Sequence, residues 1–152
     1  MIVGMNTANP PAANSPAANP PATNPTVWLT LQAHDAPALI DFYVSAFGFT
    51  VRARYDEEGT DRVAHAKLIW PEGTGGLMLG SHKPDSEWCT QPGTAAAYVV
   101  SSDPATLHRR VLDHGGARRV SDLTEKDYGS SEFAVVDPEG NQWSFGTYAG
   151  EG

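Results

Sequence analysis

The chain is short of cysteine and of basic residues, and each scarcity excludes a class of protein. Cys89 is its one cysteine, so an intrachain disulfide is excluded, and no Cys/His cluster has the spacing of a zinc site. Lys and Arg number 10 against 18 Asp and Glu, which leaves a formal charge of −8. Nucleic-acid binders need clustered basic side chains to displace counterions, so we expect no nucleic-acid partner.

Long hydrophobic runs are also missing. No segment approaches the roughly 18 apolar residues of a membrane span, and the N-terminus lacks the basic start and apolar run of a signal peptide. We therefore expect a cytoplasmic protein with no membrane partner. The acidic field would concentrate cationic small molecules near the protein, although the same charge also serves solubility alone.

Apolar bulk is scarce in one segment, "NTANPPAANSPAANPPATNP", which runs from residue 6 to residue 25. Pro, Ala and Asn recur there in near-repeats, and such a composition buries too little apolar surface to order a chain. The sequence predicts a flexible or polyproline-like tail over residues 1–25 and a single folded domain over residues 26–150.

The folded part repeats itself, with one unit over residues 26–82 and a second over 94–149. Asp35 and Asp103 occupy equivalent places, and so do the turns Pro71–Gly73 and Pro138–Gly140. Each unit reads as a strand that ends at an Asp able to cap the next helix, then that helix, then three strands. The first strands are expected at 27–33 and 95–101, and the strand after the second helix at 117–120. The pattern predicts an α+β fold made of two βαβββ repeats.

Two stretches carry a resemblance to a known family. They are "HDAPALIDFYVSAFGF", from His34 to Phe49, and "DYGSSEFAVVDPEGNQWSFGTY", from Asp127 to Tyr148. With the paired units, they resemble the vicinal oxygen chelate superfamily of glyoxalases, extradiol dioxygenases and bleomycin-resistance proteins. The resemblance implies curved mixed sheets that form cup-shaped clefts, helices on the outer face, and a homodimer whose cups hold the ligand.

In that superfamily the first and last strands of each unit supply metal ligands. The matching positions here are Trp28 and Met78 in the first unit and Ala96 and Ser144 in the second. Divalent metals prefer imidazole, carboxylate or thiolate ligands, and none of these four side chains provides one. We therefore expect no metal and no cofactor, and the closest resemblance is to the metal-free, bleomycin-resistance-like members.

Strand alternation predicts what lines the cups instead. Because side chains alternate between the two faces of a strand, the residues that share a face with Met78 and Ser144 should be ligand-binding. These cup-facing positions are Trp28, Thr30, Gln32, Met78, Tyr98, Gln142 and Ser144. The opposite parity gives an apolar, helix-facing set: Leu29, Leu31, Leu77, Leu79, Val99, Trp143 and Phe145. Two loop aromatics, Trp88 and Tyr128, are expected at the rims of the cups, or alternatively at a subunit contact.

His65 and Glu132 are the candidate catalytic residues, since they occupy the same place in the two units. Such a pair can perform acid–base chemistry or bind a metal away from the family position, although Lys67 shares the parity of His65 and the face may simply be solvated. His108 is expected to be solvent-exposed on its helix. Cys89 has no activating base nearby in the sequence, so we expect no nucleophilic role for it.

Three functional hypotheses follow. The leading one is a metal-independent small-molecule binding protein that sequesters a planar or cationic antibiotic, as the resemblance to bleomycin-resistance proteins implies. The second is a lyase, isomerase or dioxygenase of the glyoxalase type that uses a displaced metal site. The third is a regulatory or structural module without a small ligand.

Overall fold

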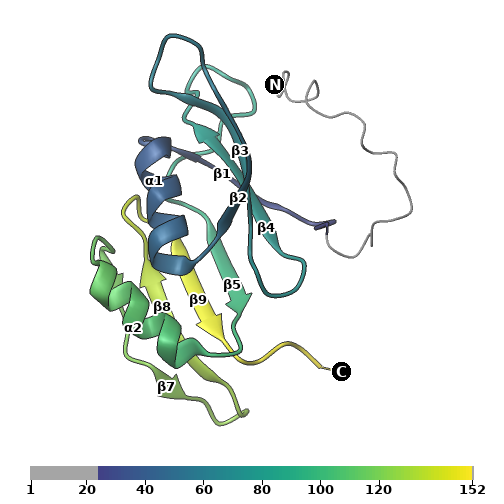
Figure 1. The fold of residues 1–152 in the computed structure, drawn as a ribbon, viewed down its shortest axis with the longest axis vertical. Helices are drawn as coiled ribbons and strands as arrows, with labels where there is room; N and C mark the ends of the chain where they lie inside the picture. The colour runs from purple at the N-terminus through teal and green to yellow at the C-terminus, as the bar shows by residue number, and fades with distance from the viewer. Residues whose placement is uncertain (1–23, 152) are drawn as a thin grey trace.

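The computed structural model describes residues 24–151, so the tail predicted over residues 1–25 lies almost entirely outside the described residues. The first repeat begins with a strand, continues through a helix whose last turn is a π-helix, and ends with three strands (Figure 1). Its elements are β1 (Leu29–Ala33), α1 (Ala36–Phe42), η5 (Tyr43–Phe47), β2 (Thr50–Asp56), β3 (Val63–Ile69) and β4 (Gly76–Ser81).

The second repeat follows the same order with one irregularity. Its elements are β5 (Ala96–Val100), α2 (Pro104–His114), β6 (Arg119–Val120), β7 (Thr124–Glu125), β8 (Ser131–Val136) and β9 (Gln142–Gly146). The strand expected over residues 117–120 is cut to the two residues of β6, and β7 pairs separately with β8. The expected strand loses its first two residues, 117 and 118, and ends at Val120 as predicted. Between β6 and β7, the Ser121 hydroxyl oxygen accepts the hydrogen bond that Ala134 N–H would otherwise give to a backbone carbonyl.

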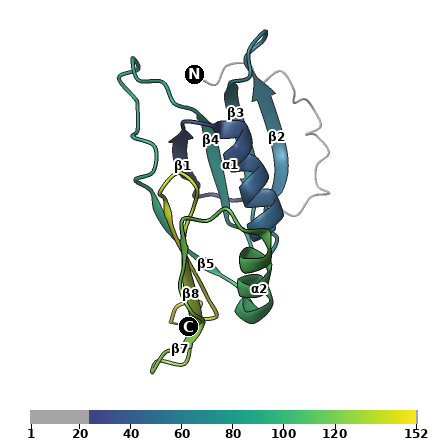
Figure 2. The same ribbon diagram turned by 90° about the vertical axis from the view of Figure 1, so that its left-hand side faces the viewer.

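Each repeat builds one mixed sheet. The strand orders are β1-β4-β3-β2 and β5-β9-β8-β6, with the first and last strands of each unit parallel and the other neighbours antiparallel. The two helices follow one another along the long axis of the molecule and lie on one side of the sheets (Figures 1 and 2). The predicted α+β fold of two βαβββ repeats is confirmed. Within residues 24–151 no helix is both long and apolar enough to span a bilayer.

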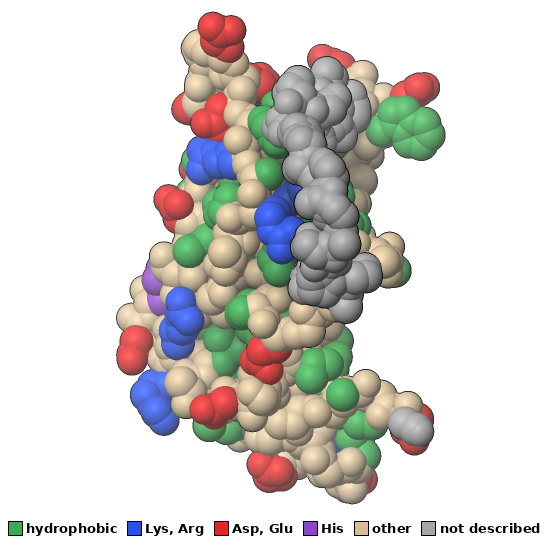
Figure 3. Space-filling model, turned by 45° about the vertical axis from the view of Figure 1, so that its right-hand side comes forward, with side chains coloured by type: hydrophobic (Ala, Val, Ile, Leu, Met, Phe, Trp, Pro, Cys, Tyr) green, Lys and Arg blue, Asp and Glu red, His purple; other side chains and the backbone are tan. Residues whose placement is uncertain are grey.

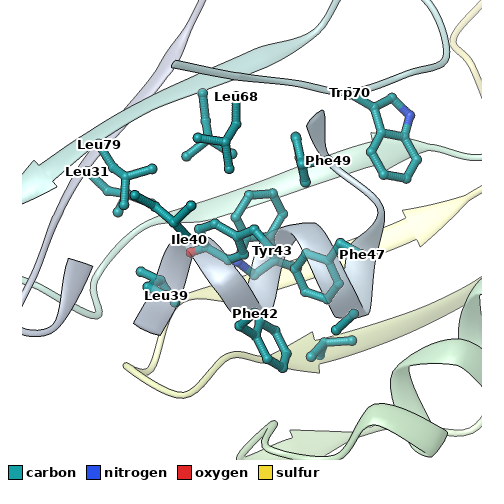
Figure 4. Close-up of a cluster of buried hydrophobic side chains, with 14 of the residues drawn as sticks. Leu31, Leu39, Ile40, Phe42, Tyr43, Phe47, Phe49, Leu68, Trp70 and Leu79 are labelled. Carbon is teal, nitrogen blue, oxygen red and sulfur yellow. The ribbon is translucent and has the colours of Figure 1, made fainter. Parts of the chain in front are cut away.

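The two repeats share one core beneath the helices. Leu31, Leu77 and Leu79 are buried on the helix side of the first sheet, as the alternation predicted, and the side chains of α1 point toward them (Figure 4). Phe47 continues this core into the second repeat, since its ring centroid lies 5.3 Å from that of Trp143 and 4.8 Å from that of Phe145. The helix of one repeat therefore packs on the sheet of the other, and burial of these rings holds the repeats together.

Each turn before a last strand also reaches across to the other repeat. The Glu139 carboxylate accepts hydrogen bonds from the backbone N–H groups of His34 and Asp35, both at 2.7 Å. Glu72, its counterpart, accepts one from Ser102 N–H at 2.9 Å. These N–H groups lie immediately before the helices, where backbone donors lack intrahelical partners. The two turns thus fix the relative position of the repeats, and with it the position of the cups.

Candidate functional site

The face of each sheet opposite the helices carries the residues predicted to bind a ligand. Thr30 lies beside Met78 in the first sheet, and Tyr98 lies beside Ser144 in the second. Trp28 precedes β1 and is half-buried. Its indole covers Gly76, since a β-carbon on this glycine would lie 2.7 Å from the indole ring. The predicted parity therefore places these side chains together, while the finer assignment of binding roles stays a prediction.

The first sheet carries a cavity of about 680 Å³, which we call the first cup. This volume lies within the range of about 300–1,000 Å³ that small-molecule sites have. Its lining includes five of the predicted site residues: Thr30, Gln32, His65, Met78 and Trp88. The rest of the lining comes from the same strands and from the loop after β4: Leu31, Ala64, Leu79, Gly80, Ser81, Lys83, Ser86 and Thr90.

The loop that carries Trp88 is fastened to the first cup. Gln32 uses its side-chain oxygen to accept a hydrogen bond from Lys83 N–H at 3.0 Å, and Ser86 Oγ accepts one from Trp88 N–H at 3.0 Å. The Trp88 side chain itself is 81% exposed, which is unusual for an indole. Because Trp88 also lines the cavity, its indole stands at the rim with an aromatic face free to contact a ligand, while its binding role stays a prediction.

His65 is the polar residue with the most unusual surroundings in the first cup. Its Nε2 is buried and has no hydrogen-bond partner within residues 24–151. Desolvation lowers the pKa of His65 below its usual 6.5, and the positive charges of Lys67 and Lys83 lower it further. The imidazole is thus kept neutral near pH 7, which lets it donate or accept a hydrogen bond without carrying charge into the cavity.

The cup side of the second sheet, which we call the second cup, holds the remaining predicted residues. Tyr98 and Gln142 are exposed there, and Ser144 is half-buried. Glu132, on β8, accepts a hydrogen bond from the Tyr128 hydroxyl at 2.7 Å. His65 and Glu132 therefore lie in different sheets, each with neighbours of its own, and no hydrogen bond joins them in the described structure.

The family's metal site finds no matching ligands in this chain. The four positions that resemblance assigns to the metal hold an indole, a thioether, a methyl group and a hydroxyl, in Trp28, Met78, Ala96 and Ser144. Among the residues whose placement is described, no group of three or more His, Cys, Asp or Glu side chains could hold a metal ion. The donor set at the family position therefore does not fit a divalent metal.

A second cavity, of about 470 Å³, was not foreseen from the sequence. It lies between the repeats, where the start of β4 faces β5, and is lined mainly by apolar side chains that include Leu29, Phe49, Trp70 and Val99. Trp70 joins the two repeats beside this cavity, since its indole N–H donates a hydrogen bond to Val100 O of the second repeat at 2.9 Å. From the sequence, Trp70 could be either a core residue or a pocket wall, and it takes the place held by Asp137 in the other repeat.

Two expectations about single residues were wrong. Cys89 does have a base beside it, because His82 Nε2 lies 3.3 Å from its sulfur atom. The loop between the repeats folds back on itself and brings them together, which spacing alone did not reveal. His108 is half-buried rather than exposed; its Nε2 lies 2.9 Å from Ser121 O, and its ring packs edge-on against Phe133.

Charge is spread over the face of the molecule that Figure 3 shows. In Figure 3 the acidic side chains are scattered across the visible face and do not gather into one patch. The net charge of −8 is consequently a poor guide to the charge of either cup. Lys83 lines the first cup, whereas Glu132 belongs to the second.

Comparison with solved structures agrees with this architecture. TioX from Micromonospora sp. ML1 superimposes with a TM-score of 0.66 at 24% sequence identity, over 81% of this chain and 99% of TioX. TnmS3, an antibiotic binding protein from Streptomyces sp. CB03234, gives 0.61 at 17% identity, over 85% and 96%. A bleomycin-binding protein complexed with bleomycin gives 0.56 at 18% identity, over 82% and 98%. These likenesses establish the fold.

Among curated proteins no sequence matches the chain significantly. The family model described as Glyoxalase/Bleomycin resistance protein/Dioxygenase superfamily, however, matches residues 26–145. That match spans both repeats and both stretches on which the resemblance rested. The chain therefore belongs to the glyoxalase/bleomycin resistance protein/dioxygenase superfamily.

Proposed function

We propose that this protein is a small-molecule binding protein that holds a planar organic molecule in the first cup without the help of a metal. The observation that carries the proposal is the cavity of about 680 Å³ with Trp88 exposed at its rim. An aromatic or heteroaromatic ring that stacks on the indole would remove apolar surface of both partners from water, and aromatic pairs add about 0.5–1.5 kcal/mol beyond that burial.

The interior of the first cup suits such a ligand. Met78 offers a flexible, polarisable thioether that adapts to the shape of a flat ring. Thr30, His65 and Lys83 add a hydroxyl, a neutral imidazole and an ammonium group, which can bind the heteroatoms of the ring system. The cavity therefore combines one stacking surface with a few polar groups, the usual composition of a small-molecule site.

The physiological role that we propose is sequestration of an antibiotic in the cytoplasm. TnmS3 is an antibiotic binding protein, and another structural relative was crystallised with bleomycin. Both resemble this chain over more than four fifths of its length, which supports the same kind of role here. We further propose that residues 26–150 act as one domain in a homodimer, since Val27 and Val100, beside the cavity between the repeats, leave apolar surface exposed.

Fluorescence titration tests the proposal. The chain has four tryptophans, and because Trp70 and Trp143 are buried, emission from Trp88 should respond most to a ligand in the first cup. Titration with bleomycin and with other planar antibiotics should give saturable quenching. Replacing Trp88 by Ala should weaken binding by about tenfold or more, whereas Leu112→Ala, which changes an exposed side chain on α2, should have no effect.

Two results would contradict the proposal. One is the absence of saturable binding to any planar antibiotic in the panel. The other is binding that Trp88→Ala leaves unchanged, which would place the ligand elsewhere, for example in the cavity between the repeats. Replacement of Trp70 by Phe distinguishes that case, since Trp70 lines the second cavity and not the first.

A further inference from the structure

Four side chains of the second cup meet at one end of β9. They are Tyr98 from β5, Tyr128 from the loop before β8, Glu132 from β8 and Tyr148 just after β9, and we call them the tyrosine cluster. The three tyrosines are 44%, 56% and 36% exposed in that order. The Tyr128 hydroxyl donates to Glu132 and the Tyr148 hydroxyl donates to Glu151, so three surface rings stand beside two carboxylates, which is more than packing of the core requires.

The absence of a side chain at Gly146 allows the cluster to form. Gly146 lies directly opposite Glu132 in the β8–β9 pair. A β-carbon at this glycine would lie 2.5 Å from Glu132 Cγ and 2.6 Å from the Tyr98 hydroxyl, closer than van der Waals contact permits. Both side chains therefore lie over the glycine, which acts as the floor of the cluster.

Hydrogen bonds hold the rings in place. The Tyr98 hydroxyl donates to Tyr148 O at 2.8 Å, and Tyr148 N–H donates to the buried Ser130 hydroxyl at 3.0 Å. Tyr128 and Tyr148 pack edge to face, with centroids 5.6 Å apart. The cluster is thus ordered before any ligand arrives, which reduces the entropy lost on binding.

The carboxylate of Glu132 has free hydrogen-bonding capacity within residues 24–151. Its Oε2 accepts the hydrogen bond from Tyr128, and this interaction raises the pKa of Tyr128 to about 12. In the described part of the chain no lysine or arginine forms an ion pair with Glu132, and its Oε1 accepts no hydrogen bond. One oxygen therefore remains available to a cation from outside the chain.

We propose that the tyrosine cluster binds an alkylammonium group, quaternary or protonated, of a small organic molecule. Aromatic faces attract such cations through their quadrupole, and a nearby carboxylate adds a Coulombic attraction. The proposal deepens the proposed function and rests on it: the first cup, with Lys83 in its lining, suits a planar ring system, whereas the tyrosine cluster suits an alkylammonium group.

The simplest test uses choline and its neutral isostere 3,3-dimethyl-1-butanol, which share a shape and differ in charge. NMR spectra of the tyrosine ring protons should show saturable shifts with choline. The neutral alcohol should bind about five-fold to thirty-fold more weakly, as the strength of cation–aromatic attraction implies. Equal binding of the two compounds would overturn the proposal, because shape alone would then explain it.

Variants locate the site. Glu132→Gln keeps the size of the side chain and removes its charge, and Tyr148→Leu removes a ring that is already partly exposed. Each should weaken choline binding about three-fold to tenfold. Glu125→Gln is the matched control, since it removes an equal charge from the neighbouring strand β7 outside the cluster. If Glu125→Gln weakened binding as much as Glu132→Gln, a diffuse acidic field would account for the effect and the cluster would be refuted.

The outcomes separate this inference from the proposed function. Suppose that the unmodified protein does not bind choline, although a planar antibiotic quenches the fluorescence of Trp88. This result refutes ligand binding by the tyrosine cluster and is consistent with ligand binding in the first cup. If choline binds but no planar antibiotic binds, ligand binding in the first cup is refuted and the proposal for the tyrosine cluster is supported. Thermal unfolding of every variant, compared with the unmodified protein, ensures that lost binding is not lost folding.

Discussion

Removing the Tyr43 hydroxyl should destabilise the protein more than an ordinary hydrogen-bond deletion. This hydroxyl donates to Asp137 Oδ2 at 2.6 Å, and both groups are buried. Asp137 also accepts hydrogen bonds from the indole N–H of Trp143 at 3.1 Å and from the side-chain amide of Asn141 at 3.0 Å. Three backbone N–H groups of the following turn complete its shell. A buried carboxylate thus joins the helix of the first repeat to the last strand of the second.

The expected magnitude follows from these contacts. A hydrogen bond to a charged group contributes about 1.5–3 kcal/mol, so Tyr43→Phe should lower the free energy of unfolding by that amount. The ring itself stays, and its packing against Phe47 and Trp143 is preserved. Asp137→Ala should cost more, about 3–5 kcal/mol, since it leaves several buried donors without an acceptor.

Urea unfolding followed by circular dichroism measures both values, and the double variant completes a mutant cycle. The coupling energy should be about 1.5 kcal/mol or more if the two groups interact as the structure indicates. A Tyr43→Phe variant within about 0.5 kcal/mol of the unmodified protein, with an unchanged m-value, would refute the reasoning, because that is the range of a neutral surface substitution.

Three further predictions concern the turns, the linker and the first cup. Glu139→Ala should lower the free energy of unfolding by about 1–3 kcal/mol, and Glu72→Ala should lower it by less, because Glu139 accepts two backbone hydrogen bonds from the other repeat and Glu72 accepts one. Urea unfolding of the two variants measures the difference. Gly93→Ala should sharply reduce the yield of folded protein, since its φ is +81° and a β-carbon would lie 2.3 Å from Glu139 O; Thr94→Ala is the control. The free energy of unfolding should fall as the pH drops from the usual histidine pKa of 6.5 toward the lowered pKa of His65 in the folded protein, because in this range the unfolded chain binds a proton at His65 more readily than the folded chain does. The urea midpoint of the unmodified protein should therefore depend on pH in this range, and that of His65→Asn should depend on it less.

The sequence predicted the fold well because the information is local. Alternating residues along β1, β4 and β9 separate a cup face from a core face, and an Asp caps each helix by accepting from the N–H three residues on. These patterns repeat in the two units, so each unit served as a check on the other. The separate strand β7 was not predicted, because the Ser121 hydroxyl between β6 and β7 competes with the backbone for a hydrogen bond, and no periodic pattern records such a competition.

Contacts between the two repeats could not be predicted from the sequence either, because no periodic pattern records them. Glu139 looked like a turn residue, and nothing along the chain showed that its carboxylate would reach His34 and Asp35. The Cys89–His82 pair likewise depends on how a long loop folds back. Long-range hydrogen bonds depend on the placement of whole units, which periodicity does not encode.

The division of charge between the cups shows why a site must be argued from its own residues. An overall charge of −8 favoured a cationic ligand anywhere on the surface. The structure instead places Lys83 in the lining of the first cup and Glu132, which has no ion-pair partner among residues 24–151, beside three tyrosines in the second. Along β9 the cup-facing residues become smaller, from Gln142 through Ser144 to Gly146, and that taper leaves room for aromatic side chains from neighbouring segments. Ser144 thus matters less as a missing metal ligand than as part of the space that the tyrosines fill.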